Sequence, residues 1–228
     1  MVKNLGGAWN IGREVVAKFY ASVPDRCPDF SIRWGSGKAG GTTLVFDLGW
    51  FKRSWSTYKE YERGYYQIGV NHIGWIPPRA PGNRWDKLEL EIVPQRESHL
   101  ERVLAVGQVA NDAQHGLSYD ELDGWMKAMF PKYRFRPHPQ GAQGIPKNTL
   151  EEDLDWCDTV LTYNSTVGLE AIRMGIPVYC STNCFYRDIA REKSVDKRRE
   201  FFNRVAYAQW TEEEIAEGKA YHYYHQFL

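Results

Sequence analysis

The stretch Asp158–Cys180, DTVLTYNSTVGLEAIRMGIPVYC, decides the fold. Its first part, 159–163, is short, apolar and partly β-branched, which predicts a buried strand. Residues 164–166 follow at once, and all three are good helix N-cap residues. Apolar side chains then recur at helical spacing up to Gly175, where the helix is expected to stop, and 176–180 is a second apolar run. The pattern predicts a strand, a polar turn, a helix and a second strand.

The polar turn of this unit, Asn164, Ser165 and Thr166, is the place where we expect a ligand. A strand-to-helix turn presents free backbone N–H groups and hydroxyls above the sheet, and such a place suits a phosphate. Glu170 lies one helical turn further on and can accept hydrogen bonds from ribose hydroxyls. The alternative is an ordinary βαβ crossover with a well-capped helix.

The motif Asn-Ser-Thr-x-Gly-x-Glu-Ala, followed by Gly-Ile-Pro-Val, resembles the donor-nucleotide site of GT-B glycosyltransferases. The resemblance is to capsule-polysaccharide and Kdo-transferase-like enzymes and to related phage-encoded proteins, and it is best from Val103 to Tyr221. It implies that the helix N-terminus holds the donor's phosphate and that Glu170 holds the ribose. Sugar-nucleotide 2-epimerases share a similar turn, so the motif indicates a nucleotide-sugar site more strongly than one reaction.

Two further strands precede this turn. The apolar run 102–107 ends at Gly107 and Gln108, and the resemblance implies that the glycine allows a close approach to the donor. Another strand runs into Arg136-Pro-His138-Pro, where the prolines fix a turn. In capsule-type glycosyltransferases and bacterial sialyltransferases a His-Pro turn places an imidazole on the donor phosphate, so the resemblance implies this role for His138. Arg136 either helps to neutralise the phosphates or only supports the turn.

The N-terminal region predicts an abbreviated first half of the same fold. A short apolar start, Gly6-Gly7 and a helical pattern are typical of a Rossmann-like opening, and a simple N-terminal helix is the alternative. Strands are predicted at 30–34 and 43–47. The loop between them is rich in glycine but does not match Gly-x-x-x-x-Gly-Lys-[Ser/Thr], so we predict a flexible loop and no phosphate-binding P-loop.

A general base is expected from this first half. Asp47 ends a predicted strand at its carboxyl edge, where α/β proteins place ligands, and it is the first candidate if the transfer inverts. His72 is a second candidate, in an aromatic stretch before a long irregular loop. The alternatives are an aspartate that caps a turn and a structural histidine.

Capping boxes predict three more helix starts, at Ser118, Thr149 and Thr211. The second of these helices contains Asp153-Leu-Asp155, which resembles the metal-binding Asp-x-Asp of other glycosyltransferases. Here the two acidic residues lie inside an amphipathic helix rather than after a strand. The pattern therefore predicts a solvated helix face and no required metal.

The composition excludes several classes of protein. The 228 residues carry 29 basic and 29 acidic side chains, and a neutral chain is not expected to hold nucleic acid mainly through phosphates. No run reaches the ~20 apolar residues of a membrane span, and the start lacks a signal-peptide core. The four cysteines lack the second pair of a zinc site, so we expect reduced thiols in a cytoplasmic protein.

Together these features predict a GT-B-like α/β protein of two Rossmann-like parts, with the reaction in the cleft between them. Residues 1–101 would form the acceptor side and 102–228 the nucleotide-sugar side. The expected reaction moves a sugar from a nucleotide-activated donor, a substrate rather than a cofactor, to a hydroxyl. The acceptor is either a hydroxymethylated base in phage DNA, which would place the protein in a bacterial host, or a saccharide. The alternatives are an epimerase or hydrolase of the same fold and a non-catalytic nucleotide-binding protein.

Overall fold

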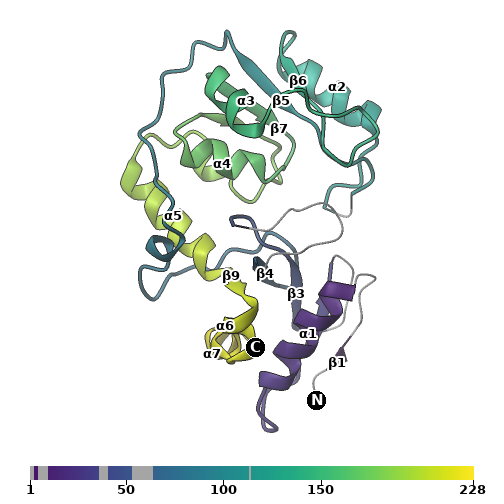
Figure 1. The fold of residues 1–228 in the computed structure, drawn as a ribbon, viewed down its shortest axis with the longest axis vertical. Helices are drawn as coiled ribbons and strands as arrows, with labels where there is room; N and C mark the ends of the chain where they lie inside the picture. The colour runs from purple at the N-terminus through teal and green to yellow at the C-terminus, as the bar shows by residue number, and fades with distance from the viewer. Residues whose placement is uncertain (1–2, 5–9, 36–40, 53–63, 113) are drawn as a thin grey trace. The chain divides into compact units, whose positions relative to one another are not determined.

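The computed structural model separates into two compact units (Figure 1). The first, Met1–Leu88 with Asn203–Leu228, is built from both ends of the chain and is called the composite unit below. The second, Glu89–Phe202, is called the parallel unit. The sequence placed the boundary at 101/102 and gave the C-terminal residues to the second part, whereas the structure divides the chain after Leu88 and again after Phe202. The structure describes residues 3–4, 10–35, 41–52, 64–112 and 114–228.

The composite unit contains a five-stranded mixed sheet. Its strands are β1 (Lys3–Asn4), β2 (Ser31–Trp34), β3 (Thr43–Leu48), β4 (Tyr65–Val70) and β9 (Gln209–Thr211). They lie in the order β1-β2-β3-β4-β9; the first three run parallel, whereas β4 is antiparallel to both β3 and β9. The predicted strands at 30–34 and 43–47 are confirmed, and the antiparallel half of the sheet is a departure from a fully parallel Rossmann-like part.

The helices of the composite unit pack around an aromatic core. They are α1 (Asn10–Ser22), η1 (Trp85–Leu88), α6 (Glu212–Ala216), α7 (Lys219–Tyr224) and η3 (His225–Phe227). Helix α1 buries Val15, Val16 and Phe19, and the Phe19 ring meets Phe46 of β3 edge to face, with the ring centroids 5.1 Å apart. The helix predicted near the N-terminus is therefore confirmed. Gly6-Gly7 and residues 36–40 of the predicted glycine loop lie outside the described residues.

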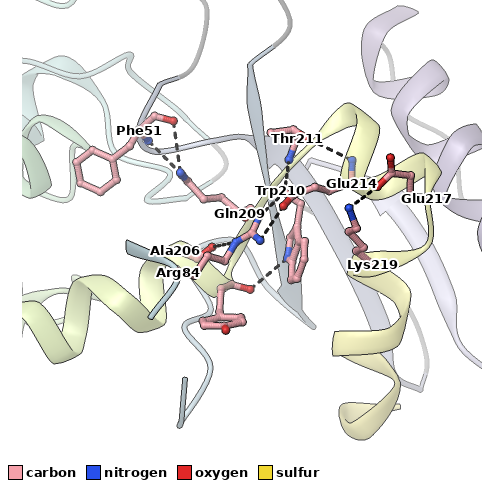
Figure 2. A network of polar contacts seen from close by, with 10 residues as sticks. Phe51, Arg84, Ala206, Gln209, Trp210, Thr211, Glu214, Glu217 and Lys219 are labelled. Atoms are coloured by element: carbon pink, nitrogen blue, oxygen red, sulfur yellow. Dashed lines mark hydrogen bonds and ion pairs between the residues drawn. The ribbon is translucent and has the colours of Figure 1, made fainter. Parts of the chain in front are cut away.

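Buried polar contacts attach the end of the chain to its beginning (Figure 2). The Oε1 atom of Gln209 accepts hydrogen bonds from the backbone N–H groups of Trp50 and Phe51, at 3.0 and 3.1 Å. The Arg84 guanidinium forms a two-pronged ion pair with Glu214 and lies 4.0 Å from the centre of the Trp210 ring. Burial alone would raise the pKa of Glu214, but the hydrogen bond and charge of Arg84 outweigh it and hold that pKa below its ordinary value.

The parallel unit contains a four-stranded, wholly parallel sheet. Its strands are β5 (Val103–Val106), β6 (Arg134–Arg136), β7 (Thr159–Thr162) and β8 (Val178–Tyr179). Its helices are α2 (Tyr119–Met129), α3 (Leu150–Trp156), α4 (Val167–Arg173) and η2 (Arg187–Ile189), and α5 (Val195–Tyr207) crosses the unit boundary. The strands lie in the order β6-β5-β7-β8, with α2, α3 and α4 around them (Figure 1). The strand–helix alternation predicted from 102 to 180 is confirmed.

The helix starts follow the predicted capping boxes. In α2, α3 and α6 the side chains of Ser118, Thr149 and Thr211 each accept a bond from the backbone three residues on, and the glutamate there bonds back. Helix α2 covers the sheet face that carries Val103, Ala105 and Leu161. Local sequence therefore fixes these helix starts, and the apolar alternation fixes which face each element buries.

Candidate functional site

The parallel sheet reverses its strand order between β5 and β7. From β5 the chain moves to β6 on one side, then returns past β5 to β7 on the other side. In open α/β sheets such a reversal leaves a crevice outside the carboxyl ends of the strands, and ligands bind there. Three of the predicted site regions follow these ends: Gln108 after β5, His138 after β6 and Asn164–Thr166 after β7.

Gln108 bridges the two strands at the reversal. Its Oε1 accepts the backbone N–H of Asn164 at 2.9 Å, and its Nε2 donates to the Asn164 side-chain oxygen. Thr162 supports the same bridge, because its hydroxyl lies 3.5 Å from Gln108 Oε1 and accepts the N–H of Ser165 at 3.2 Å. Gln108 is only 9% exposed. The Gln108 side chain therefore holds the turn in place.

The turn itself satisfies most of its own backbone, which corrects the prediction of free N–H groups at this point. The N–H groups of Asn164 and Ser165 are bonded to Gln108 and Thr162, and those of Val167 and Gly168 are bonded to the Ser165 hydroxyl and carbonyl. Thr166 has helical backbone angles and its side chain makes no capping bond. What the turn presents is therefore mainly side-chain groups on a backbone whose N–H groups are already bonded.

Tyr186 supports the turn through a hydrogen bond to the Ser165 carbonyl. This residue was not among the predicted site residues. Its side chain is fully buried, and its hydroxyl donates to the Ser165 carbonyl at 2.6 Å. Gly168 makes room for it, because a Cβ at that position would lie 2.2 Å from the tyrosine oxygen. Burial raises the pKa of Tyr186 well above its ordinary value of 10.0, so the hydroxyl stays protonated and keeps donating.

Glu170 is held by Arg173, a partner that was not predicted above. Its Oε2 accepts from Nε of Arg173 at 2.9 Å, one helical turn away, and Nη1 of Arg173 donates to the Glu91 carbonyl at 3.1 Å. The Glu170 side chain is 27% exposed, so it is still within reach of solvent. The i,i+3 spacing of the two residues is the signal that would have predicted this pair.

The His-Pro turn gives His138 a defined tautomer. Its Nδ1 accepts the backbone N–H of Gln140 at 3.1 Å, and its carbonyl accepts that of Gly141 at 2.9 Å. A neutral imidazole that accepts at Nδ1 carries its proton on Nε2. The ring therefore has an Nε2–H that can donate a hydrogen bond, as the predicted role on a phosphate requires.

Arg136 supports this region through Asp153. Its Nη1 donates to Asp153 Oδ2 at 2.6 Å and to the carbonyls of Asn148 and Thr149 at 2.9 and 3.1 Å. Of the two interpretations left open by the sequence, these contacts favour the supporting one. They also correct the expected solvated helix face, because Asp153 is only 3% exposed, whereas the side chain of Asp155 is 73% exposed.

A glycine is required at position 107 because β6 lies close to it. A Cβ there would lie 2.8 Å from the Phe135 ring and 3.2 Å from the Arg136 carbonyl, which accepts the Gly107 N–H at 2.8 Å. The glycine thus allows β5 and β6 to stay paired at their carboxyl ends. The close approach that requires it is to the neighbouring strand.

Asp47 belongs to the composite unit. It lies next to the end of β3, as predicted, opposite Gln67 of β4, and its Oδ1 accepts the N–H of Leu48 at 2.7 Å. His72 is exposed, in the turn after β4. Within the described parts of the chain, no group of three or more His, Cys, Asp or Glu residues is placed to hold a metal ion. Over the same residues, no helix has the length and apolar character needed to cross a membrane.

Comparisons with known proteins bear on the fold. No family model and no curated protein matches the chain. Among solved structures, KpsC of Thermosulfurimonas dismutans, a β-Kdo 2,7 transferase, matches with a TM-score of 0.60 and 15% identity, over 95% of this chain and 97% of that chain. KpsC of the same organism, a β-Kdo 2,4 transferase, matches with a TM-score of 0.50 and 16% identity, over 90% of this chain and 89% of that chain.

At these identities the comparison establishes the fold. The chain has an α/β fold of the GT-B glycosyltransferase type, and the predicted resemblance to Kdo-transferase-like enzymes is confirmed at that level. The two halves that carry the fold are the mixed sheet of the composite unit and the parallel sheet of the parallel unit.

Proposed function

We propose that the protein is a glycosyltransferase that moves a sugar from a nucleotide-activated donor to a hydroxyl. One observation carries the proposal: Gln108 ties the carboxyl ends of β5 and β7 together at the reversal of a parallel sheet, beside a half-buried polar turn. Binding sites in open α/β sheets lie at such reversals. The GT-B-type fold supports the same reaction class, since the two matched structures are transferases.

The donor phosphate would bind beside the turn. The Asn164 side chain and the hydroxyls of Ser165 and Thr166 can donate hydrogen bonds there, and Nε2–H of His138 adds a further donor. Negative charge grows on the phosphate as the bond to the sugar breaks. Donors that are already fixed in place stabilise that charge without reorganising, which is the main electrostatic contribution to such reactions.

The ribose would bind at Glu170. Arg173 holds one carboxylate oxygen, and Oε1 has no hydrogen-bond partner among the described residues. A carboxylate oxygen accepts from two adjacent ribose hydroxyls more strongly than a neutral acceptor would, because the bond is charge-assisted. Arg173 thus sets the rotamer, and Glu170 makes the contact.

The acceptor hydroxyl needs a base if the reaction inverts the sugar, and Asp47 is the proposed one. Positioning the two substrates would supply a further large part of the acceleration, since oriented reactants can save ~7–11 kcal/mol. We favour a saccharide hydroxyl over a hydroxymethylated base in DNA. With 29 basic and 29 acidic side chains, the chain lacks the positive charge that phosphate-backbone binding normally uses.

The test is a transfer assay with defined donors and acceptors. Cytidine-, uridine- and guanosine-based sugar nucleotides are incubated with the protein, alone, with oligosaccharides, or with a DNA duplex that contains 5-hydroxymethylcytosine, and products are read by mass spectrometry. We expect acceptor-dependent transfer to the saccharides, with Asp47→Asn lowering kcat while the nucleotide Kd stays unchanged. Equal turnover without any acceptor would indicate an epimerase or hydrolase, and nucleotide affinity without turnover would indicate a binding protein.

A further inference from the structure

Tyr119 is bonded to the turn that carries His138. It is the first residue of α2, and its hydroxyl oxygen accepts the backbone N–H of Ala142 at 2.9 Å. The start of this helix is well defined, because Ser118 and Glu121 close a capping box there. The bond therefore joins the loop that follows β6 to the helix that precedes this strand.

Three successive backbone N–H groups are bonded in this turn. That of Gln140 donates to Nδ1 of His138 at 3.1 Å, and that of Gly141 donates to the His138 carbonyl at 2.9 Å. The third, of Ala142, donates to Tyr119. The first two bonds lie within the turn, whereas the third reaches another element. Local bonds in a loop open easily unless contacts with a more stable element hold them, so the bond to Tyr119 supports the other two.

Gly141 brings the tyrosine and the histidine to the same point. A Cβ at this position would lie 3.3 Å from the Tyr119 hydroxyl oxygen and 3.4 Å from Cβ of His138. Both side chains therefore pack against the backbone of one residue. Directly after it, residues 142–145 are exposed, with Ile145 84% exposed. Tyr119 thus holds the loop at the place where the chain leaves His138 and enters solvent.

The far end of this loop is attached separately. The Asn148 carbonyl accepts from Nη1 of Arg136 at 2.9 Å, and the Asn148 side chain donates to Asp153 at 2.8 Å. These bonds hold the loop where α3 begins, several residues after His138. They leave the position of the imidazole to the contacts at the beginning of the loop, where Tyr119 supplies the bond from another element.

We propose that Tyr119 is a positioning residue of the candidate site, which keeps the His138 imidazole in place with its Nε2–H directed to the donor phosphate. The role of His138 in this proposal rests on the proposed function. A donor that is fixed before the reaction stabilises the growing charge on the phosphate without reorganising. Because that charge grows only as the bond to the sugar breaks, Tyr119 should affect kcat more than the affinity for the nucleotide.

The kinetic test is a double-mutant cycle with the sugar nucleotide that the wild type turns over fastest. Tyr119→Phe keeps the ring and removes the hydroxyl, so kcat should fall about two- to tenfold, the range for one net hydrogen bond, with little change in nucleotide Kd. In a His138→Ala background the same change should have no further effect. The control is Tyr133→Phe, which removes a hydroxyl bonded to Asp123 at 3.2 Å, directly before β6, and should leave kcat unchanged. An unchanged kcat in Tyr119→Phe, or an equal fall in both backgrounds, would overturn the proposal.

A second measurement needs no ligand. Two-bond nitrogen–proton correlations in NMR spectra of the full chain report which ring nitrogen of His138 carries the proton. We expect the Nε2–H tautomer in the wild type and in Tyr133→Phe, and a mixture of tautomers in Tyr119→Phe, because the bond from Gln140 to Nδ1 loosens. Unchanged ring signals in Tyr119→Phe would overturn the positioning role. If the wild type transfers no sugar from any donor, the proposed function fails, while these spectra still decide whether Tyr119 holds His138.

Discussion

Each unit of this molecule contains a buried glutamine that bonds to the backbone of another segment. In the composite unit Gln209, fully buried, accepts from the N–H groups of Trp50 and Phe51. In the parallel unit Gln108, 9% exposed, accepts from the N–H of Asn164 and donates to its side chain. The chemistry is the same, but Gln209 holds the end of the chain to its beginning, whereas Gln108 holds a half-buried polar turn at a strand reversal.

The difference shows where polar groups serve structure and where they are available for a ligand. In the composite unit Arg84 is buried, and it bonds to the half-buried Glu214 and to the Gln209 carbonyl of the same unit. In the parallel unit the polar residues 164–166 stay half-buried, and Gln108 and Tyr186 bond to the backbone of this turn. Disrupting the first set should cost stability, and disrupting the second should cost binding.

The largest effect is expected from Arg84→Ala. The change leaves the Glu214 carboxylate without its buried partner, and breaking such a pair typically costs about 3–5 kcal/mol. Hydrogen exchange should show the loss of protection in the composite unit, with the strands of the parallel unit still protected. The control is Lys219→Ala, which removes an exposed ion pair with Glu217 and should leave the exchange pattern unchanged. Equal loss of protection in both units would contradict the division.

The second effect concerns Gly168 of α4. Gly168→Ala places a Cβ within 2.2 Å of the Tyr186 oxygen, so overpacking should cost about 1–3 kcal/mol and displace the turn. The urea concentration at the unfolding midpoint and the nucleotide affinity should both fall. Gly124→Ala on α2 meets nothing within 4 Å and should stabilise the helix by up to about 1 kcal/mol. Equal stability of the two variants would contradict the close packing of Tyr186 against Gly168.

The two glutamines give the third comparison. Gln108→Ala leaves the Asn164 N–H without its acceptor, and an unsatisfied buried donor costs about 1–3 kcal/mol, so nucleotide Kd should rise roughly tenfold. Gln209→Ala should lower the unfolding free energy by a similar amount and leave Kd unchanged. Titration calorimetry on both variants, with urea unfolding alongside, separates the two outcomes. Weaker nucleotide binding in Gln209→Ala than in Gln108→Ala would contradict the assignment of the nucleotide site to the parallel unit.

The smallest effect is in the pH dependence. Burial alone raises the pKa of Asp153, but hydrogen bonds from Asn148 and Arg136 and nearby arginine charges outweigh it, so that pKa lies below its ordinary value of 3.8. A carboxyl with a lowered folded-state pKa stabilises the fold above its unfolded pKa, and the contribution is lost as the pH falls through the folded value. Asp153→Asn should therefore flatten the fall of stability below about pH 4. Asp155→Asn, at an exposed position, is the control, and an unchanged acid profile in Asp153→Asn would contradict the inference.

Sequence reasoning was most reliable where contacts are local. The strand, turn and helix around Asn164, the capping boxes and the GT-B-type fold all follow from residues within a few positions of each other. It missed β9, because Gln209–Thr211 pairs with β4, far away in the chain. It also missed the bond of Tyr186 to the Ser165 carbonyl and that of Arg173 to the Glu91 carbonyl, because these partners lie 21 and 82 residues away in the chain.

For the same reason, the positions of the site residues were predicted better than their hydrogen-bond partners. The sequence gives residue types at the end of each strand, so Gln108, His138 and Asn164 were found at the carboxyl edge of one parallel sheet. It does not give the partner of each donor. The backbone of the turn is bonded internally, Arg136 is bonded to Asp153, and these contacts could be found only in three dimensions.

The most direct test of the central claim is a hydrogen-exchange footprint with and without saturating CMP, CDP, UDP or GDP. We expect the nucleotide that binds best to slow exchange at 108–112 and 163–170 of the parallel unit, and Glu170→Ala to abolish this slowing. Slowing confined to the composite unit, or binding that leaves 163–170 unchanged, would contradict the claim that this turn holds the donor.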